Sequence, residues 1–216
     1  MSDIDDPATE PLLGRVARRR QKNLEALIQA GQEVMGEKGI DAATMLEIAD
    51  RADIGAGTVY SYFKSKDDLA IAVLERLMYD LALRIETVTD TFTDPAQVYA
   101  FGIWNVLVAA TSDLRWKQLL NRSEVIAEAM VRQMGPFAMR DMQNATRAGR
   151  FRVTDADLTF RMAAHAIVGV ALAVTSGTLP EAAIAECVVR LLCMTGIGLD
   201  EAQDLAQRPR PPLPPA

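Results

Sequence analysis

A chain of 216 residues is longer than a usual single domain, and its composition excludes several classes of protein. Half of the residues are hydrophobic, which suffices for a sizeable core, and no run of β-branched residues alternates as in a strand. We therefore predict an all-α fold. Cys187 and Cys193 lie six positions apart on an expected helix, which prevents a disulfide between them, and neither has a metal-ligand spacing. This cysteine usage fits a reducing cytoplasm.

The formal net charge of −6 argues by itself against a nucleic-acid partner, but the charges are unevenly distributed. Residues 15–66 contain nine Lys or Arg and seven Asp or Glu, which gives this segment a charge of +2. The remaining 14 basic and 22 acidic residues give −8. A mildly basic segment on an acidic body predicts that only the N-terminal part of the chain meets phosphate.

The chain begins with a polar stretch and then a cluster of cations. Residues 1–14 contain four acidic residues, two prolines and no helical period, so we expect a disordered arm, too polar for a signal peptide. Apolar residues at helical spacing predict the first helix over residues 18–37, with its end at Gly39. The cations at its start are Arg15, Arg18, Arg19, Arg20 and Lys22.

The segment from Thr44 onward has the local signals of two short helices joined by a tight turn. Thr44 and Glu47 form a capping box, in which each residue satisfies an unpaired N–H at the start of a helix. Asp, Ile and Gly at residues 53–55 favour a turn, and a second, short helix follows over residues 56–62. This arrangement predicts a helix-turn-helix, whose second helix enters the major groove of DNA.

At this point the sequence resembles the N-terminal domain of the TetR family of bacterial transcriptional regulators, over roughly residues 22–75. The resemblance implies a DNA-binding regulator that dimerises through its last two helices and binds a ligand in a C-terminal domain. Gly55 and Ala56 depart from the family pattern, which often has Ser-Lys or similar polar residues there. The matching positions are Lys38-Gly39, Thr44, Ile48-Ala49, Ala52, Gly57-Thr58-Val59-Tyr60, Tyr62-Phe63 and Ser65-Lys66.

The second short helix is expected to have one face in the core and one at the surface. Val59 and Phe63 point inward, whereas hydroxyl groups on the outward face donate to phosphates or base edges. Half-buried packing is the alternative interpretation of the two tyrosines, and a solvated helix start is the alternative for the arginine cluster. The predicted DNA-binding residues are Arg18, Arg19, Thr44, Gly55, Ala56, Thr58, Tyr60, Ser61, Tyr62, Lys64 and Lys66.

The rest of the chain is also expected to be helical. Ser65 and Asp68 form another capping box, which opens one long helix to about residue 89. Asp94 caps the next helix, over residues 95–111, which is apolar nearly all round and should be buried. Further helices are expected through Asn121 and over residues 123–148, 155–176 and 180–197, with Pro136 kinking or breaking the second of these.

Large or polarizable side chains on these helices are the predicted lining of a ligand pocket. Plain packing is the simpler interpretation of each one taken singly, and a core or interface position is the simpler interpretation of His165. Composition favours an apolar effector held by one polar anchor. The predicted ligand-binding residues are Tyr99, Trp104, Trp116, Met130, Met134, Phe137 and His165.

The last two helices have the pattern of a packing seam. Small residues four positions apart on one helix and apolar residues at alternating spacing on the other predict a four-helix bundle with a second copy of the chain. The uncharged stretch over residues 162–180 just reaches the length of a membrane span, but its histidine, threonines and serine argue against that interpretation. The predicted interface residues are Gly169, Ala173, Ile184, Val188, Leu191 and Thr195.

No catalytic motif is recognisable, since the chain has one histidine, no metalloprotease motif and no phosphate-binding glycine loop. We therefore predict a protein that is not an enzyme and needs no cofactor or metal. The predicted domains are a disordered arm (1–14), a helix-turn-helix domain (15–66), a helical ligand-binding and dimerisation domain (67–206) and a proline-rich disordered tail (207–216).

The predicted function is that of a cytoplasmic homodimeric repressor, controlled by a small apolar ligand. Its operator should be pseudo-palindromic, with half-sites about one helical turn apart or a multiple of it. The alternative is a helical small-molecule binding protein with a vestigial helix-turn-helix. Gly55, Ala56 and the acidic balance favour that alternative.

Overall fold

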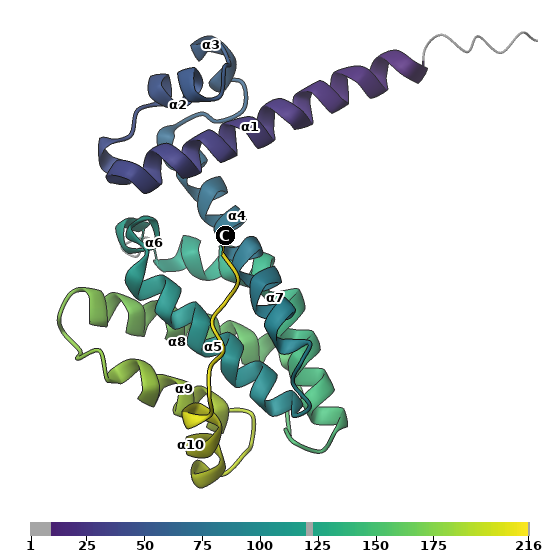
Figure 1. Cartoon of the computed structure of the whole chain (residues 1–216), viewed down its shortest axis with the longest axis vertical. Helices are drawn as coiled ribbons and strands as arrows, with labels where there is room; N and C mark the ends of the chain where they lie inside the picture. Colours follow the sequence, from purple (N-terminus) through teal and green to yellow (C-terminus); the bar gives the residue numbers. More distant parts are fainter. Residues whose placement is uncertain (1–9, 120–122, 216) are drawn as a thin grey trace, which may run out of the picture. The chain divides into compact units, whose positions relative to one another are not determined.

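The computed structural model describes residues 10–119 and 123–215, and every regular element within these ranges is a helix (Figure 1). The predicted all-α fold is therefore confirmed. The chain divides into two compact units, the first ending at Val73 and the second beginning at Leu74. This boundary lies inside a long helix, whereas the domain boundary was predicted after residue 66.

The N-terminal unit packs its helices around a small apolar core. Completely buried side chains come from each helix of the unit, and burial of each contributes about 1.5–3 kcal/mol. They are Leu27, Met35, Ile48, Val59 and Leu69. The helices are α1 (Glu10–Ala42), α2 (Met45–Arg51), α3 (Ala56–Val59) and the start of α4 (Lys66–Thr89).

Helix α1 begins at Glu10, well before the predicted start at residue 18. The assignment of residues 10–14 to a disordered arm was therefore wrong, while residues 1–9 lie outside the described part of the chain. Residues 15–22 are mainly Arg, Gln and Lys, which have good helix propensity, so the helix extends over them without an apolar stripe. Gly39 adopts φ 82° and interrupts the regular helix as predicted, but a further turn continues to Ala42.

Local hydrogen bonds confirm the predicted start of α2. Thr44 Oγ1 accepts from Glu47 N at 3.2 Å, and Glu47 Oε2 accepts from Thr44 N at 3.1 Å, as in a capping box. Asp53 adopts a left-handed conformation with φ 53° in the turn that follows. Helix α3 ends at Val59, earlier than predicted, because residues 60–62 form tighter turns.

The C-terminal unit surrounds α5 with other helices (Figure 1). Helix α5 packs against α7, α8, α9 and α10, which explains why its sequence is apolar nearly all round. Cys187 and Cys193 are free thiols, as their spacing predicts. The helices are the end of α4, α5 (Pro95–Ser112), α6 (Leu114–Leu119), α7 (Ser123–Arg147), α8 (Ala156–Thr175), α9 (Ala183–Cys193) and α10 (Leu199–Gln207).

The helices of this unit differ in part from those predicted. Helix α7 contains Pro136 and remains assigned as one helix on both sides of it. The predicted end of the preceding helix, Asn121, lies outside the described residues. Helix α9 ends at Cys193, and α10 was not predicted, although Gly198 followed by two acidic residues in its first turn is a start signal.

Gly196 lies between α9 and α10, at a position where only glycine fits. Its φ of 90° is strained for any side chain, and a Cβ atom added to it would lie 2.9 Å from Cβ of Arg152. Arg152 is held in place because its backbone N–H donates to Thr195 O at 2.8 Å. The close approach of the two segments therefore requires glycine.

Asp94 joins three parts of the C-terminal unit. As the N-cap of α5, its carboxylate accepts from Ala96 N at 3.0 Å. It also accepts two hydrogen bonds from Arg150, at 3.0 and 3.1 Å, and one from Arg208 at 2.7 Å. Burial acts to raise the pKa of Asp94, but the hydrogen bonds from Arg150 and Arg208 outweigh it and hold the pKa below its usual 3.8.

We expect Asp94→Ala to lower the free energy of unfolding of this unit by about 1–2 kcal/mol at pH 7, because it removes the helix cap. Since the pKa of Asp94 is lowered by folding, its stabilisation is complete above pH 3.8 and is lost as the pH falls further. The difference between wild type and variant should therefore shrink below about pH 4. Urea unfolding followed by fluorescence measures this unit, which contains both tryptophans, Trp104 and Trp116.

The matched control is Asp204→Ala, because Asp204 is largely exposed and interacts with Arg208 alone among the cations of this network. It should change stability little. A loss equal to that of Asp94→Ala would contradict the assignment.

Candidate functional site

The helix-turn-helix of the N-terminal unit presents hydroxyl groups to solvent. Thr58, Tyr60 and Ser61 are exposed, with 58% of Tyr60 accessible, whereas Val59 and Phe63 are buried. Ser61 Oγ donates to Thr58 O at 2.6 Å, which fixes the orientation of its own hydroxyl. The exposed Tyr60 side chain offers both an aromatic ring and a hydroxyl group to a partner.

Other predicted DNA-binding residues in this unit have internal partners. The ring of Tyr62 is half-buried, with the Arg20 guanidinium 5.7 Å from its centroid. Lys66 Nζ donates to Asp41 O at 2.8 Å, and Thr44 is engaged in the capping box. These three contribute to the shape of the unit, and the half-buried packing foreseen as the alternative describes Tyr62.

The remaining predicted contacts are exposed. Gly55, Ala56 and Lys64 are accessible, and only Thr58 Oγ1 lies within 4 Å of a Cβ added to Gly55. Arg18 and Arg19 are exposed as well, but on the first turns of α1 and not on a flexible arm. Their positions are therefore fixed by the helix.

Ion pairs brace α2 against α1. Arg51 donates to Glu37 at 3.0 Å and to Glu33 at 3.3 Å, and hydrogen bonding to Arg51 lowers the pKa of Glu37. Lys38 pairs with Glu47, the second member of the capping box. These exposed pairs contribute little stability singly, but they join the two helices at two points.

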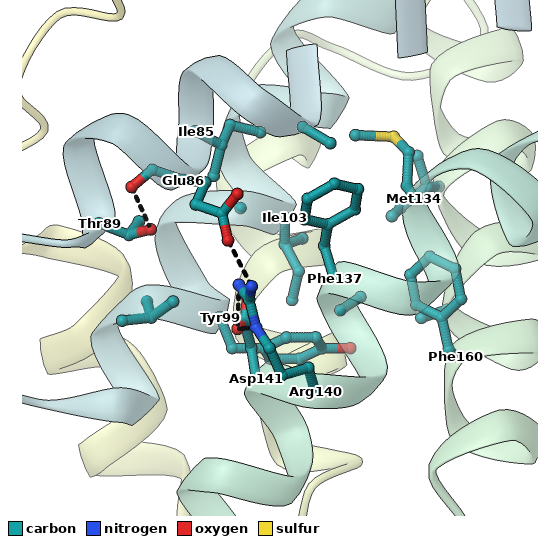
Figure 2. Close-up of a pocket in the computed structure, with 16 residues that line it drawn as sticks. Ile85, Glu86, Thr89, Tyr99, Ile103, Met134, Phe137, Arg140, Asp141 and Phe160 are labelled. Carbon is teal, nitrogen blue, oxygen red and sulfur yellow. Dashed lines mark hydrogen bonds and ion pairs between the residues drawn. The ribbon is translucent and has the colours of Figure 1, made fainter. Parts of the chain in front are cut away.

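The C-terminal unit contains an apolar cavity of about 50 Å³ between α4, α5, α7 and α8 (Figure 2). Its walls are aliphatic and aromatic, with one or more side chains from each of the four helices. Figure 2 shows Phe137 from α7 next to Met134, and Phe160 from α8 beyond them. The apolar lining comprises Ala82, Ile85, Val98, Gly102, Ile103, Met134, Phe137, Ala138, Phe160, Ala163 and Ile167.

One edge of the cavity is polar and carries three charged groups. Arg140 pairs with Glu86 and donates to Asp141 at 2.9 Å, and its guanidinium lies 5.7 Å from the Phe137 ring centroid (Figure 2). Burial raises the pKa of Asp141, although Arg140 opposes this shift. Two carboxyl groups face one guanidinium here, so the edge is not a site for an anion.

Tyr99 supplies a phenol to the same cavity. Its side chain is only 4% exposed, and its ring stacks edge-on against Phe151. Burial, and secondarily the Asp141 carboxylate, raise the pKa of Tyr99, which keeps the phenol neutral. Among the residues that the structure describes, we find no hydrogen-bond partner for this hydroxyl, and it lines the cavity. It is therefore available to a ligand.

The structure brings together three of the seven predicted ligand-binding residues, namely Tyr99, Met134 and Phe137. Trp116 and Met130 lie in the packed core. Trp104 lies outside the cavity, beneath Arg210, and His165 is exposed on α8, where its Nδ1–H donates to Arg161 O at 2.8 Å. These four residues therefore do not line this cavity, contrary to the prediction.

Sequence reasoning missed the charged edge of the cavity. Glu86, Arg140 and Asp141 were not singled out, since charged residues mostly lie at the surface. Phe160 is an aromatic one turn from the start of α8, and only its packing against α7 distinguishes it from other core residues. No local sequence signal identifies these side chains as neighbours.

The predicted interface between copies also needs correction. Ile184, Val188, Leu191 and Thr195 are buried inside their own subunit, so their spacing reflects packing within the chain. Gly169 is exposed and Ala173 half-exposed on α8. Around them, α8 exposes Leu158 and Met162, which are 55% and 54% accessible, together with His165.

Helix α8 is also the one described helix that is long and apolar enough to cross a membrane. Its inner face packs in the core of the unit through Phe160, Ala164, Ile167 and Ala171. Separately, within the described residues no three His, Cys, Asp or Glu side chains are grouped so as to hold a metal ion.

Both parts of the chain match models of known families. Residues 27–73 match the model described as bacterial regulatory proteins, tetR family. Residues 94–208 match the model described as the tetracyclin repressor-like C-terminal domain. The second match alone covers more than half of the 216 residues.

Relatives of this chain carry names of transcriptional regulators. The transcriptional activator FasR of Mycolicibacterium smegmatis is 37% identical over 112 residues, which are 52% of this chain and 51% of that protein. The transcriptional repressor KstR of Mycobacterium tuberculosis is 30% identical over 123 residues, 57% of this chain and 50% of that protein. The chain thus spans about half the length of these curated relatives.

A solved structure extends the similarity to nearly the whole chain. RolR in complex with resorcinol superposes with a TM-score of 0.81 and 26% sequence identity, over 92% of this chain and 100% of RolR. The two family models therefore agree with a fold-level match that includes both units. The chain belongs to the TetR family of bacterial regulatory proteins.

Proposed function

We propose that this chain is a cytoplasmic transcriptional repressor that binds duplex DNA as a homodimer and is controlled by a small molecule in its C-terminal unit. The observation that carries the proposal is the exposed hydroxyl surface of Thr58, Tyr60 and Ser61 above a buried Val59 and Phe63. The family membership supports it.

Exposed groups divide between the two tasks of DNA binding. Tyr60 and Thr58 lie where a short recognition helix meets base edges, and their hydroxyl, methyl and ring groups suit direct readout. Lys64 and the arginines of α1 neutralise phosphates, which fixes the position of the protein on the duplex and carries no sequence information. Gly55 and Ala56 leave room for close approach of the backbone.

Two substitutions separate these tasks. We expect Lys64→Ala to reduce the slope of log affinity against log salt concentration by about one, because one phosphate contact is lost. We expect Tyr60→Ala to weaken binding by about 1–3 kcal/mol at every salt concentration while leaving the slope unchanged. Fluorescence anisotropy measures both, on a duplex selected by the wild-type protein from a random pool.

The matched control for the cation is Lys117→Ala, an exposed lysine of the C-terminal unit, which should change neither slope nor affinity. If the wild-type protein selects no duplex, or its affinity does not fall with salt, the chain is instead a small-molecule binding protein with a vestigial helix-turn-helix.

We propose that two copies of the chain meet along the exposed face of α8. This face contains Leu158, Met162, His165, Gly169 and Ala173, which recur at helical spacing. Gly169 and Ala173 are among the interface residues predicted from the sequence. No atom lies within 4 Å of a Cβ added to Gly169, so a partner helix has room to approach closely there. A dimer with two-fold symmetry then matches a pseudo-palindromic operator.

Placing a charge in this face should separate the copies. Met162→Glu is expected to raise the dimer dissociation constant at least about tenfold, because an unpaired carboxylate would be buried on association. Sedimentation velocity over a range of concentrations measures it. Leu199→Glu is the control, since Leu199 is similarly exposed but lies on α10. Unchanged association of Met162→Glu would place the interface elsewhere.

We propose that the effector is a small uncharged molecule with an apolar body and a hydroxyl group. The apolar walls accept the body, the Tyr99 hydroxyl and the Asp141 carboxyl offer hydrogen bonds, and the excess of carboxyl groups disfavours an anion. RolR, which is described with resorcinol bound, supports this class. The effector acts only through different affinities for two conformations, and bound DNA must weaken effector binding to the same degree.

Tyr99→Phe tests the polar anchor with resorcinol as the probe and benzoate as its anionic counterpart. Loss of one hydrogen bond should weaken resorcinol binding about two- to tenfold with little change in thermal stability. Isothermal titration calorimetry measures the affinity. Tyr79→Phe removes an exposed hydroxyl outside the cavity and should have no effect. Equal affinity of Tyr99→Phe, or tighter binding of benzoate than of resorcinol, would overturn the assignment.

A further inference from the structure

The C-terminal segment over residues 208–215, expected to be disordered, lies against the C-terminal unit at three points. It leaves α10 in an extended conformation, with φ −59° and ψ 151° at Arg208, and runs across α5 toward α4 (Figure 1). Arg208 donates to Asp94 at 2.7 Å and to Gln97 at 3.2 Å. The first contact point is therefore the start of α5.

The second contact point is a tryptophan. The guanidinium of Arg210 lies 3.5 Å from the ring centroid of Trp104, which is within the range of a cation–π interaction. The same guanidinium donates to Ala206 O at 3.2 Å, so it is held from both sides. Phe101, Ala100 and Val188 border the groove that the segment covers here.

The third contact point is on α4. Arg84 Nε donates to Pro214 O at 2.7 Å, and this hydrogen bond is partly buried. The next two residues of α4, Ile85 and Glu86, line the ligand cavity. The segment thus connects the wall of the cavity with α5 and α10 over a sequence separation of 130 residues.

The high proline content of the segment reduces the conformational entropy that is lost when it attaches. Five of the last ten residues are proline, which restricts the unfolded segment to extended conformations close to the bound one. Few contacts are therefore enough to hold it. Three contacts along eight residues form a defined attachment and not a loose tail.

The size of the cavity gives the attachment a role. About 50 Å³ is too small for an aromatic ring, which needs on the order of 150 Å³. One wall must therefore move when a ligand enters, and α4 is the wall that the C-terminal segment holds.

We infer that residues 208–215 form a strap that holds the last turns of α4 against α5 and opposes opening of the cavity. Release of Pro214 from Arg84 accompanies the movement of α4. The consequence for effector binding rests on the proposed function, whereas the restraint on α4 does not.

Hydrogen exchange of the full chain, without DNA or effector, tests the restraint directly. A chain ending at Arg210 keeps the contacts of Arg208 and Arg210 and removes the one to Arg84; Arg84→Ala removes the same contact from the other side. Both should speed exchange of backbone amides over residues 80–89 about two- to tenfold and leave α9 unchanged. The double variant should add nothing further.

Arg76→Ala is the matched control, because Arg76 lies on the same helix and pairs only with Asp80 among described residues. Unchanged exchange over residues 80–89 in both variants would overturn the strap, and so would effects that add in the double variant. Because no ligand is present, failure of the strap is distinguishable from failure of the proposed function.

Discussion

Burial of α5 on several sides is the constraint on which the C-terminal unit depends. Helices α7, α8, α9 and α10 all pack against it, so each of its faces has a different neighbour. Tyr99 on one face enters the cavity, Trp104 on another meets Arg210, and Asp94 at its start gathers two arginines. Cavity, C-terminal segment and helix cap therefore all have residues of α5 among their contacts.

The helix-turn-helix was predictable because its signals are local. Thr44 and Glu47 lie three residues apart, and their hydrogen bonds depend on nothing distant. The cavity was predictable only for its aromatic and methionine side chains, Tyr99, Met134 and Phe137. Glu86 and Arg140 are separated by 54 residues, and only the packing of α4 against α7 makes them partners.

The apolar periodicity of α9 did not identify the surface against which this helix packs. The spacing of Ile184, Val188, Leu191 and Thr195 correctly indicates a buried stripe, but a stripe does not identify the surface that covers it. Within one chain, α10 and α5 already do so. Helix α10 itself lacked the long apolar period that would have made it predictable, since only Ala202 and Leu205 are buried on it.

Charge counts along the sequence overstate the cations available to DNA. Lys38 and Arg51 are engaged by acidic side chains, and Lys66 by a backbone carbonyl, all within the N-terminal unit. The charges of Lys38 and Arg51 are thereby partly neutralised, whereas Lys66 keeps its charge but is held by the carbonyl. The field presented to phosphate is therefore set by α1 and Lys64 more than by the sum over the segment.

The glycine between α9 and α10 has a consequence for how natural variation in this protein is interpreted. Gly196 is exposed, yet its backbone angle and its distance from Arg152 exclude every other side chain. A survey of tolerated mutations would rank this surface position among the least permissive in the chain, although it touches neither the cavity nor the hydroxyl surface. Invariance there would record the geometry of a helix connection and not selection for recognition.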